Sequence, residues 1–202
     1  PMSRSIFAFP VVIFGCSAAF AQQEVCIDDA WMTARSLIAH NDSSFAQGLM
    51  ETLKPADGAA AYSLQWPLIA AETTWHTGDK ALGEAFNPAQ YIEWVERYES
   101  RLTDRGLLSA AGLVNWPETL REGFDYGTAA AGESAVLNAY YFGALNGFGR
   151  LNVGFGRVAR PFTYRAGLIE KAFHEYLIDP ATGLVKDAPD SANASIHANA
   201  IA

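Results

Sequence analysis

The sequence predicts an all-α fold built from successive helical hairpins. Apolar residues recur every three or four positions along most of the chain, which is the spacing of one helix face. No stretch alternates apolar and polar residues for long enough to indicate a β-strand. Glycine, proline and asparagine stand between the periodic segments, where helices begin and end. With 202 residues, the chain is long enough for one domain with a sizeable core.

The first predicted helices cover residues 28–41 and 43–55. The apolar face of the first helix contains Ala30, Trp31, Ala34, Leu37 and Ile38. Ser43 or Ser44 caps the second helix, and Pro55 ends it. Because the connection between them is short, we expect the two helices to be antiparallel.

The next two predicted helices lie at residues 60–76 and 88–102. Pro67 stands inside the first of them, where its missing N–H predicts a bend or one unpaired carbonyl group. Gly78 predicts the C-terminal end of that helix. The Asn87-Pro88 pair provides a cap and a first-turn proline for the second helix, whose apolar stripe contains Tyr91, Val95, Tyr98 and Leu102.

Two further helices are predicted at residues 133–148 and 161–177. The apolar stripe of the second contains Tyr164, Leu168, Ala172 and Tyr176. The sequence Asp179–Gly183 is typical of a turn, and another helix is predicted to begin near Ser195. The sequence Gly-Phe-Gly-Arg at 147–150 recurs seven residues later; we expect both copies in a connection, and they lack the spacing of a phosphate-binding loop.

The charge and cysteine content exclude several kinds of partner. The net charge is -8 and no lysine or arginine cluster is present, which argues against nucleic acid because phosphate binding needs a concentrated positive field. Cys16 and Cys26 stand in no metal-binding pattern, and the four histidines are scattered. We therefore expect no metal and no cofactor. The two cysteines could pair if oxidised, or remain free thiols.

The N-terminal segment, residues 1–21, has two interpretations. Arg4 precedes an apolar run that ends in Ala19-Phe20-Ala21, which is the pattern of a secretory signal peptide. The same residues would suit an apolar helix buried in a domain. The run is short for a membrane span. The protein would be exported in the first case and cytoplasmic in the second, and residues 22–202 form the predicted domain.

The longest interruption between predicted helices, residues 103–132, is the best candidate for a functional loop. Loops of more than about 15 residues are uncommon in compact domains unless they have a function. The Trp116-Pro117 pair has acidic residues nearby, a combination that can stack on a sugar ring and bind its hydroxyl groups. Alternatively, the Trp116 side chain is buried at the end of the helical core. Glu118, Glu122 and Asp125 could supply an acid/base pair, or simply form a solvated acidic loop.

Seven short segments, in one order along the chain, carry a family resemblance. They are Tyr62–Leu68, Thr77–Asp79, Asp104–Leu108, Leu113–Arg121, Leu137–Tyr141, Asp179–Leu184 and Ser195–Ala200. Together they resemble the helical catalytic domain of bacterial α-L-rhamnosidases, glycoside hydrolase family 78, among the six-hairpin glycosidases. The resemblance extends from about Cys26 to Ala202.

The resemblance implies part, about half to two thirds, of an (α/α)6 toroid that hydrolyses terminal α-L-rhamnose with inversion. Such hydrolysis uses a carboxylic acid and a carboxylate about 6.5–9.5 Å apart. The substrate-binding residues that the resemblance implies are Asp29, Trp66, Asn115, Trp116 and His197. Asp29 is also explained by the helix dipole, and His197 as a structural histidine. The other tryptophans, Trp31, Trp75 and Trp94, are expected in the core or at an interface.

Two features depart from the pattern of the family. Gln22 stands where the family has its general acid, and a glutamine cannot protonate a leaving group. The general base of the family lies beyond the helix that begins near Ser195. We therefore expect a truncated or degenerate copy with unknown catalytic residues and little hydrolysis by itself. The alternative is a non-catalytic helical module that binds carbohydrate or protein, and an incomplete barrel edge also predicts self-association.

Overall fold

The computed structural model describes residues 30–39, 46, 60–78, 88–109, 123–125, 127 and 132–202. Within these ranges the regular elements are helices packed against each other, and no strand is formed. Two isolated antiparallel bridges join Leu102 to Leu108 and Ile178 to Val185. The prediction of an all-α fold is therefore confirmed, and the toroid stays a prediction.

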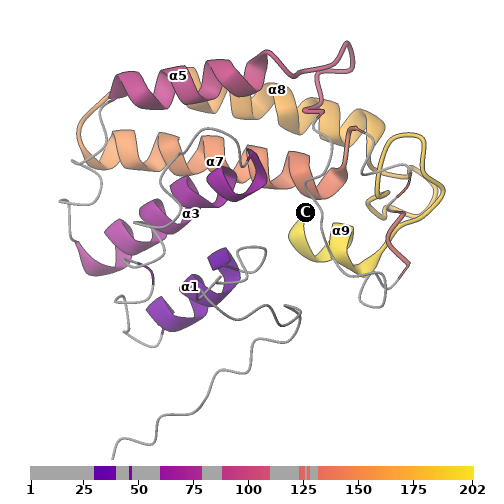
Figure 1. Ribbon diagram of the computed structural model, residues 1–202, viewed down its shortest axis with the longest axis horizontal. Coiled ribbons are helices and arrows are strands. Elements are labelled where there is room, and N and C mark those ends of the chain that lie inside the picture. The colour runs from indigo at the N-terminus through magenta and orange to yellow at the C-terminus, as the bar shows by residue number, and fades with distance from the viewer. Residues whose placement is uncertain are drawn as a thin grey trace, which may run out of the picture.

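The helices closely follow the predicted ranges. In chain order they are α1 (Ala30–Ala39), α3 (Ala60–Thr77), α5 (Pro88–Glu99), α7 (Ala135–Gly154), α8 (Arg160–Tyr176) and α9 (Ile196–Ile201). Figure 1 shows α7 in the middle of the bundle, with α5 and α8 on one side and α3, followed by α1, on the other. The shorter α9 lies beside the N-terminal part of α7.

Glycine residues let α7 approach its neighbours closely. A Cβ atom at Gly147 would lie 2.6 Å from the carbonyl oxygen of Pro67 in α3, and one at Gly149 would lie 3.3 Å from Thr163 in α8. Such distances leave no room for a side chain at Gly147. The prediction that residues 147–150 form a connection was wrong, because these glycines are packing surfaces inside a helix that continues to Gly154.

An aromatic cluster joins α5 to α7. The ring of Tyr91 lies 4.5 Å from that of Phe148, and the ring of Trp94 lies 5.0 Å from it. Tyr98 stacks on Tyr141 with ring centroids 5.6 Å apart. All these side chains are buried, so the predicted apolar stripe of α5 is confirmed at Tyr91, Val95 and Tyr98. Aromatic contacts of this kind stabilise the core beyond the area that they bury.

The predicted apolar stripe of α8 was wrong at Tyr164 and Leu168 and is confirmed at Ala172. Tyr164 is 65% exposed and Leu168 is 51% exposed. The buried face contains Phe162, Ala166, Ile169 and Ala172. The ring of Phe162 packs 5.6 Å from that of Phe148, and this contact fixes which side of α8 faces α7. Several faces of α8 carry apolar residues, so the helical period did not specify its rotation.

The tryptophans expected in the core or at an interface have different environments. Trp94 is buried, Trp31 is half-buried, and Trp75 near the end of α3 is 83% exposed. A core position is therefore confirmed for Trp94 and excluded for Trp75, for which a position at an interface stays a prediction. α3 remains helical on both sides of Pro67.

Some predictions concern residues that the structure does not describe. The segment 1–21 and most of the predicted helix at 43–55 lie outside the described residues. Among the helices that are described, none is both long and apolar enough to cross a membrane.

The contact between Gly147 and Pro67 can be tested by substitution. We expect Gly147→Ala to lower the free energy of unfolding by roughly 1–3 kcal/mol, because the new methyl group must displace the backbone of α3. Gly154→Ala is the control, since a Cβ atom there meets nothing within 4 Å. Urea unfolding followed by circular dichroism measures both. Equal stability of the two variants would contradict the close contact.

Candidate functional site

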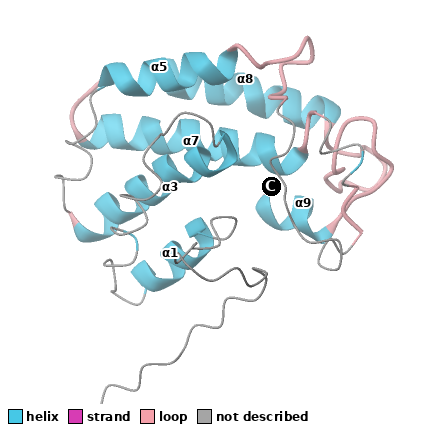
Figure 2. Ribbon diagram, in the orientation of Figure 1, coloured by secondary structure: helices cyan, strands magenta, loops and turns pink. Residues whose placement is uncertain are grey.

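The connections of the bundle meet where α5 and α8 end and where α7 and α9 begin. We call this region the loop end; it comprises residues 99–109, 123–125, 132–134 and 177–195. Figure 2 shows loops on the right of the molecule, where α8 ends and α9 begins, and the loop that follows α5 at the top. Functional side chains are often carried on loops that a rigid scaffold positions, so this is the candidate site.

Asp187 is the centre of the loop end. Its side chain is fully buried and accepts hydrogen bonds from the backbone N–H of Asp125 at 2.8 Å and of Ser195 at 3.0 Å, and from the Ser195 hydroxyl. The backbone carbonyl of Asp187 accepts from the N–H of Ala135, 2.9 Å away. One carboxylate residue thereby joins the start of α7, the start of α9 and the segment at residue 125. A buried carboxylate requires such donors to offset its desolvation.

Two serines extend this network. The Ser195 hydroxyl, which donates to Asp187, accepts a hydrogen bond from the backbone N–H of Ala198 and so caps α9. The Ser191 hydroxyl donates to the Asp125 carboxylate at 2.7 Å. The predicted start of a helix near Ser195 is therefore confirmed, and its cap is tied to the buried centre of the loop end.

Two asparagine side chains hold loop segments against helices. The Asn138 amide in α7 accepts from the N–H of Leu108 at 2.7 Å and donates to the carbonyl of the same residue at 3.0 Å. Asn199 in α9 binds both backbone groups of Val185 in the same way, each at 2.9 Å. An amide offers a donor and an acceptor side by side, so it can pair with a residue as a neighbouring strand would.

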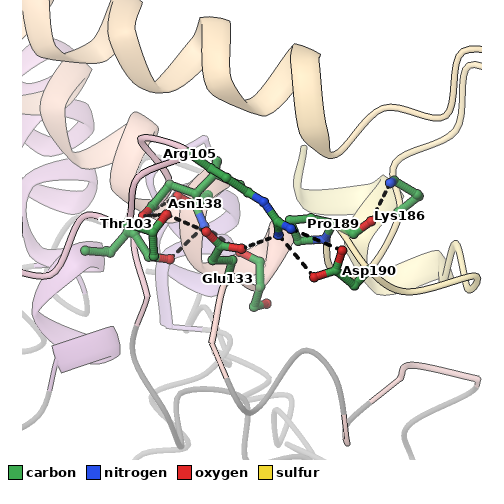
Figure 3. A network of polar contacts seen from close by, with 10 residues as sticks. Thr103, Arg105, Glu133, Asn138, Lys186, Pro189 and Asp190 are labelled. Carbon is green, nitrogen blue, oxygen red and sulfur yellow. Dashed lines mark hydrogen bonds and ion pairs between the residues drawn. The ribbon is translucent and has the colours of Figure 1, made fainter.

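Arg105 links three segments of the loop end, as Figure 3 shows. Its guanidinium group lies 2.8 Å from the Glu133 carboxylate and 3.1 Å from that of Asp190, and Thr103 donates to Glu133 as well. The hydrogen bonds to Asp190 and Glu133 raise the pKa of Arg105 above its ordinary value. The guanidinium also lies over the Tyr176 ring, 5.9 Å from its centroid.

The turn predicted at residues 179–183 is confirmed. The Asp179 carboxylate accepts from the N–H of Ala181 at 2.8 Å and from the Thr182 hydroxyl at 2.9 Å. These two hydrogen bonds lower the pKa of Asp179. Gly183 has a φ angle of 73°, a left-handed conformation that favours glycine at this position.

Four carboxylates of the loop end already have partners. Asp125, Glu133, Asp187 and Asp190 each accept at least one hydrogen bond from a neighbouring segment. Their observed role is to hold loops in place, and acid/base chemistry by any of them would first require these bonds to break. In the part of the chain that the structure describes, no three histidine, cysteine or acidic side chains gather as a metal ion would need.

The substrate-binding residues implied by the resemblance are not brought together among the described residues. Asp29, Asn115 and Trp116 lie outside those residues. Trp66 is 2% exposed and lies in the core, its ring 6.3 Å from that of Tyr91. His197 is half-buried in the first turn of α9, at the loop end. The sugar-binding roles of all five residues stay predictions.

Sequence reasoning did not identify Asp187, the centre of the network. Its only local signal was a polar residue near a proline, which is equally typical of a solvated loop. Asn138, Asn199 and Arg105 belonged to segments noted for their resemblance, without an assigned role.

No protein-family model matches the chain, and no curated protein matches it. Its function must therefore be inferred from its own residues and their geometry.

The role of Asp187 predicts that removing its negative charge lowers the stability of the fold. Asp187→Asn should lower the free energy of unfolding by about 1–3 kcal/mol, because an amide group would then face a backbone N–H that needs an acceptor. Hydrogen exchange at the amides of Asp125 and Ser195 should accelerate in parallel. Asp190→Asn is the control, since that side chain is 72% exposed and should change stability little. Unaltered hydrogen exchange at these two amides in Asp187→Asn would show that the carboxylate does not hold the loop end together.

Proposed function

We propose that the chain is a domain of the α-L-rhamnosidase type, whose loop end binds the terminal α-L-rhamnose of a glycoside. The seven segments that resemble this family support the proposal. Four of them contribute to the loop end or to the helices that begin there: 104–108, 137–141, 179–184 and 195–200. Asn138 from the second segment binds Leu108 from the first at 2.7 Å.

The observation that carries the proposal is the anchoring of the loop that contains Trp116. Residues 110–122 lie outside the described residues, and the segments on both sides are described. On one side, Leu108 is bound by Asn138. On the other side, the Gly123 carbonyl accepts from Asn193 at 3.2 Å, and the Asp125 N–H donates to Asp187. Fixed flanking residues reduce the conformational entropy that the segment between them loses when it binds a ligand.

The ligand chemistry follows from the residues of that loop and from the charge of the chain. A tryptophan presents a flat apolar face, and Asn115 and His197 offer groups that can bind hydroxyls. A net charge of -8 disfavours a polyanionic ligand and permits a neutral sugar. These features suit a neutral monosaccharide at the end of a glycoside.

The second candidate is a module that binds carbohydrate without hydrolysing it. It is favoured by the loop-end carboxylates, which serve as acceptors for Arg105, Ser191, Ser195 and backbone N–H groups. Gln22, which stands where the family has its general acid, also favours this candidate. Inverting hydrolysis needs both an acid and a base, and neither is assigned here.

Rhamnose binding tests both candidates. L-Rhamnose should bind saturably in a calorimetric titration, and Trp116→Ala should weaken it about tenfold because a stacking face is lost. Trp75→Ala is the matched control, since that indole is 83% exposed on α3. Circular dichroism checks that both variants fold.

Hydrolysis of p-nitrophenyl α-L-rhamnoside, followed by the release of p-nitrophenol, distinguishes the two candidates. Hydrolysis by the purified chain would establish the enzyme, and binding without hydrolysis would establish the module. Absence of rhamnose binding in the folded chain would contradict the carbohydrate assignment altogether.

Self-association through an apolar surface is part of the same proposal. A cavity of about 380 Å³ opens between α3, α7, α8 and α9 and is lined mostly by apolar side chains, among them Leu68, Phe142 and Phe173. Open apolar surface favours association of copies. Light scattering after size exclusion should show a mass that rises with concentration. A monomer at every concentration would contradict this expectation.

A further inference from the structure

The cavity of about 380 Å³ that opens between α3, α7, α8 and α9 is bordered by two hydrophobic clusters. Phe142 packs against the main core of the bundle, and Phe173 packs against a smaller cluster that contains Leu177 and Val185. Both phenylalanines line the cavity, and both are half-buried. Cavities of this size are typical of small-molecule sites. A ligand in the cavity can therefore contact both rings.

Aromatic side chains form much of the lining. Besides Phe142 and Phe173, it contains Tyr140 of α7 and Trp31 of α1. The guanidinium of Arg35 lies over the Trp31 ring, 5.5 Å from its centroid, so that ring already binds a cation. Phe142 and Phe173 form no ring contact and no cation–π contact with another described residue. Because the face of an aromatic ring attracts a cation, these two rings can bind a positively charged ligand.

Glu170 supplies a negative charge to the lining. It is the one carboxylate side chain among the described residues that line the cavity, and none of them is a lysine or an arginine. Glu170 is exposed, and it forms no ion pair or hydrogen bond with another described residue. His174, which also lines the cavity, is charged only when it is protonated. The Glu170 carboxylate is therefore available to a cation.

Two helix ends add to the negative potential. The lining includes Phe173 and His174 from the last turn of α8 and Ile201 from the end of α9. The C-terminal end of a helix carries a partial negative charge. The N-terminal end of α1 also borders the cavity through Trp31, but the N–H of Trp31 donates to the Gln65 side chain at 2.8 Å. The lining as a whole thus favours a cation with apolar surface.

We propose that this cavity binds the quaternary ammonium group of a small organic cation. The methyl groups of the ligand lie against the rings of Phe142 and Phe173, and its positive charge lies near the Glu170 carboxylate. The cavity contains none of the residues assigned to sugar binding, so this proposal does not depend on rhamnose binding. It also differs from self-association, which needs apolar surface and does not need Glu170.

Choline and 3,3-dimethylbutan-1-ol test the role of charge, because they have the same shape and only choline is a cation. The titration uses the whole chain and follows the methyl signal of each probe by NMR. Choline should bind saturably and about tenfold more tightly than the alcohol. The chain is kept at a concentration where light scattering gives a constant mass, so that association of copies does not enter the measurement.

Two substitutions locate the binding. Glu170→Gln should weaken choline about three- to tenfold and leave the alcohol within about twofold, because only the charged probe is attracted by the carboxylate. Glu96→Gln is the matched control at an exposed glutamate of α5 outside the cavity, and it should change neither affinity. Phe173→Leu keeps an apolar side chain and removes the ring, so it should also weaken choline more than the alcohol.

Three results would overturn the proposal. The first is that choline does not bind saturably. The second is that choline binds no more tightly than the alcohol, which would indicate an apolar cavity without preference for a cation. The third is that Glu170→Gln affects choline no more than Glu96→Gln does. Circular dichroism checks that each variant folds, and Glu170→Gln is decisive if Phe173→Leu does not fold, because Glu170 is exposed.

Discussion

The close approach of α7 to α3 at Gly147 and Pro67 is the contact on which the rest of the bundle depends. It sets α7 in the middle, because a side chain at this position would collide with the backbone of α3. With that face fixed, Phe148 meets the aromatic rings of α5 and of α8. A pair of helices that touch at backbone distance has little freedom to rotate or slide, so the neighbouring faces are determined too.

The loop end is held by polar contacts in addition to a small hydrophobic cluster that includes Leu107, Leu177 and Val185. Asp187 gathers backbone donors, Asn138 and Asn199 act as amide clamps, and Arg105 joins the carboxylates of Glu133 and Asp190. Backbone groups of loops must find partners when they are buried, and side chains supply them here. Asn138, Asn199 and Arg105 lie in segments that resemble the rhamnosidase family. Their observed role is to hold loop segments against helices, and the proposed sugar chemistry depends on Trp116, which lies outside the described residues.

Polar groups near the two faces of α7 have contrasting environments. At the loop end, donors outnumber acceptors around the Asp187 side chain, and the carboxylate is satisfied by three of them. On the side of α5 and α8, the Tyr141 hydroxyl is buried and has no hydrogen-bond partner among the described residues. Burial of a polar group costs free energy unless it is paired, so the first arrangement stabilises the fold and the second does not.

The sequence by itself determined the helices, the turn at Asp179 and the cap at Ser195, because periodicity, turns and caps depend on residues within about four positions of one another. The tertiary structure alone decided that Tyr164 and Leu168 face solvent, that Trp66 is buried, and that the glycines of residues 147–150 pack inside a helix. It also decided the partners of Asp187 and of Arg105, the latter joined to a residue 85 positions away. Such pairings arise only when separate helices dock, so no local pattern in the chain can specify them.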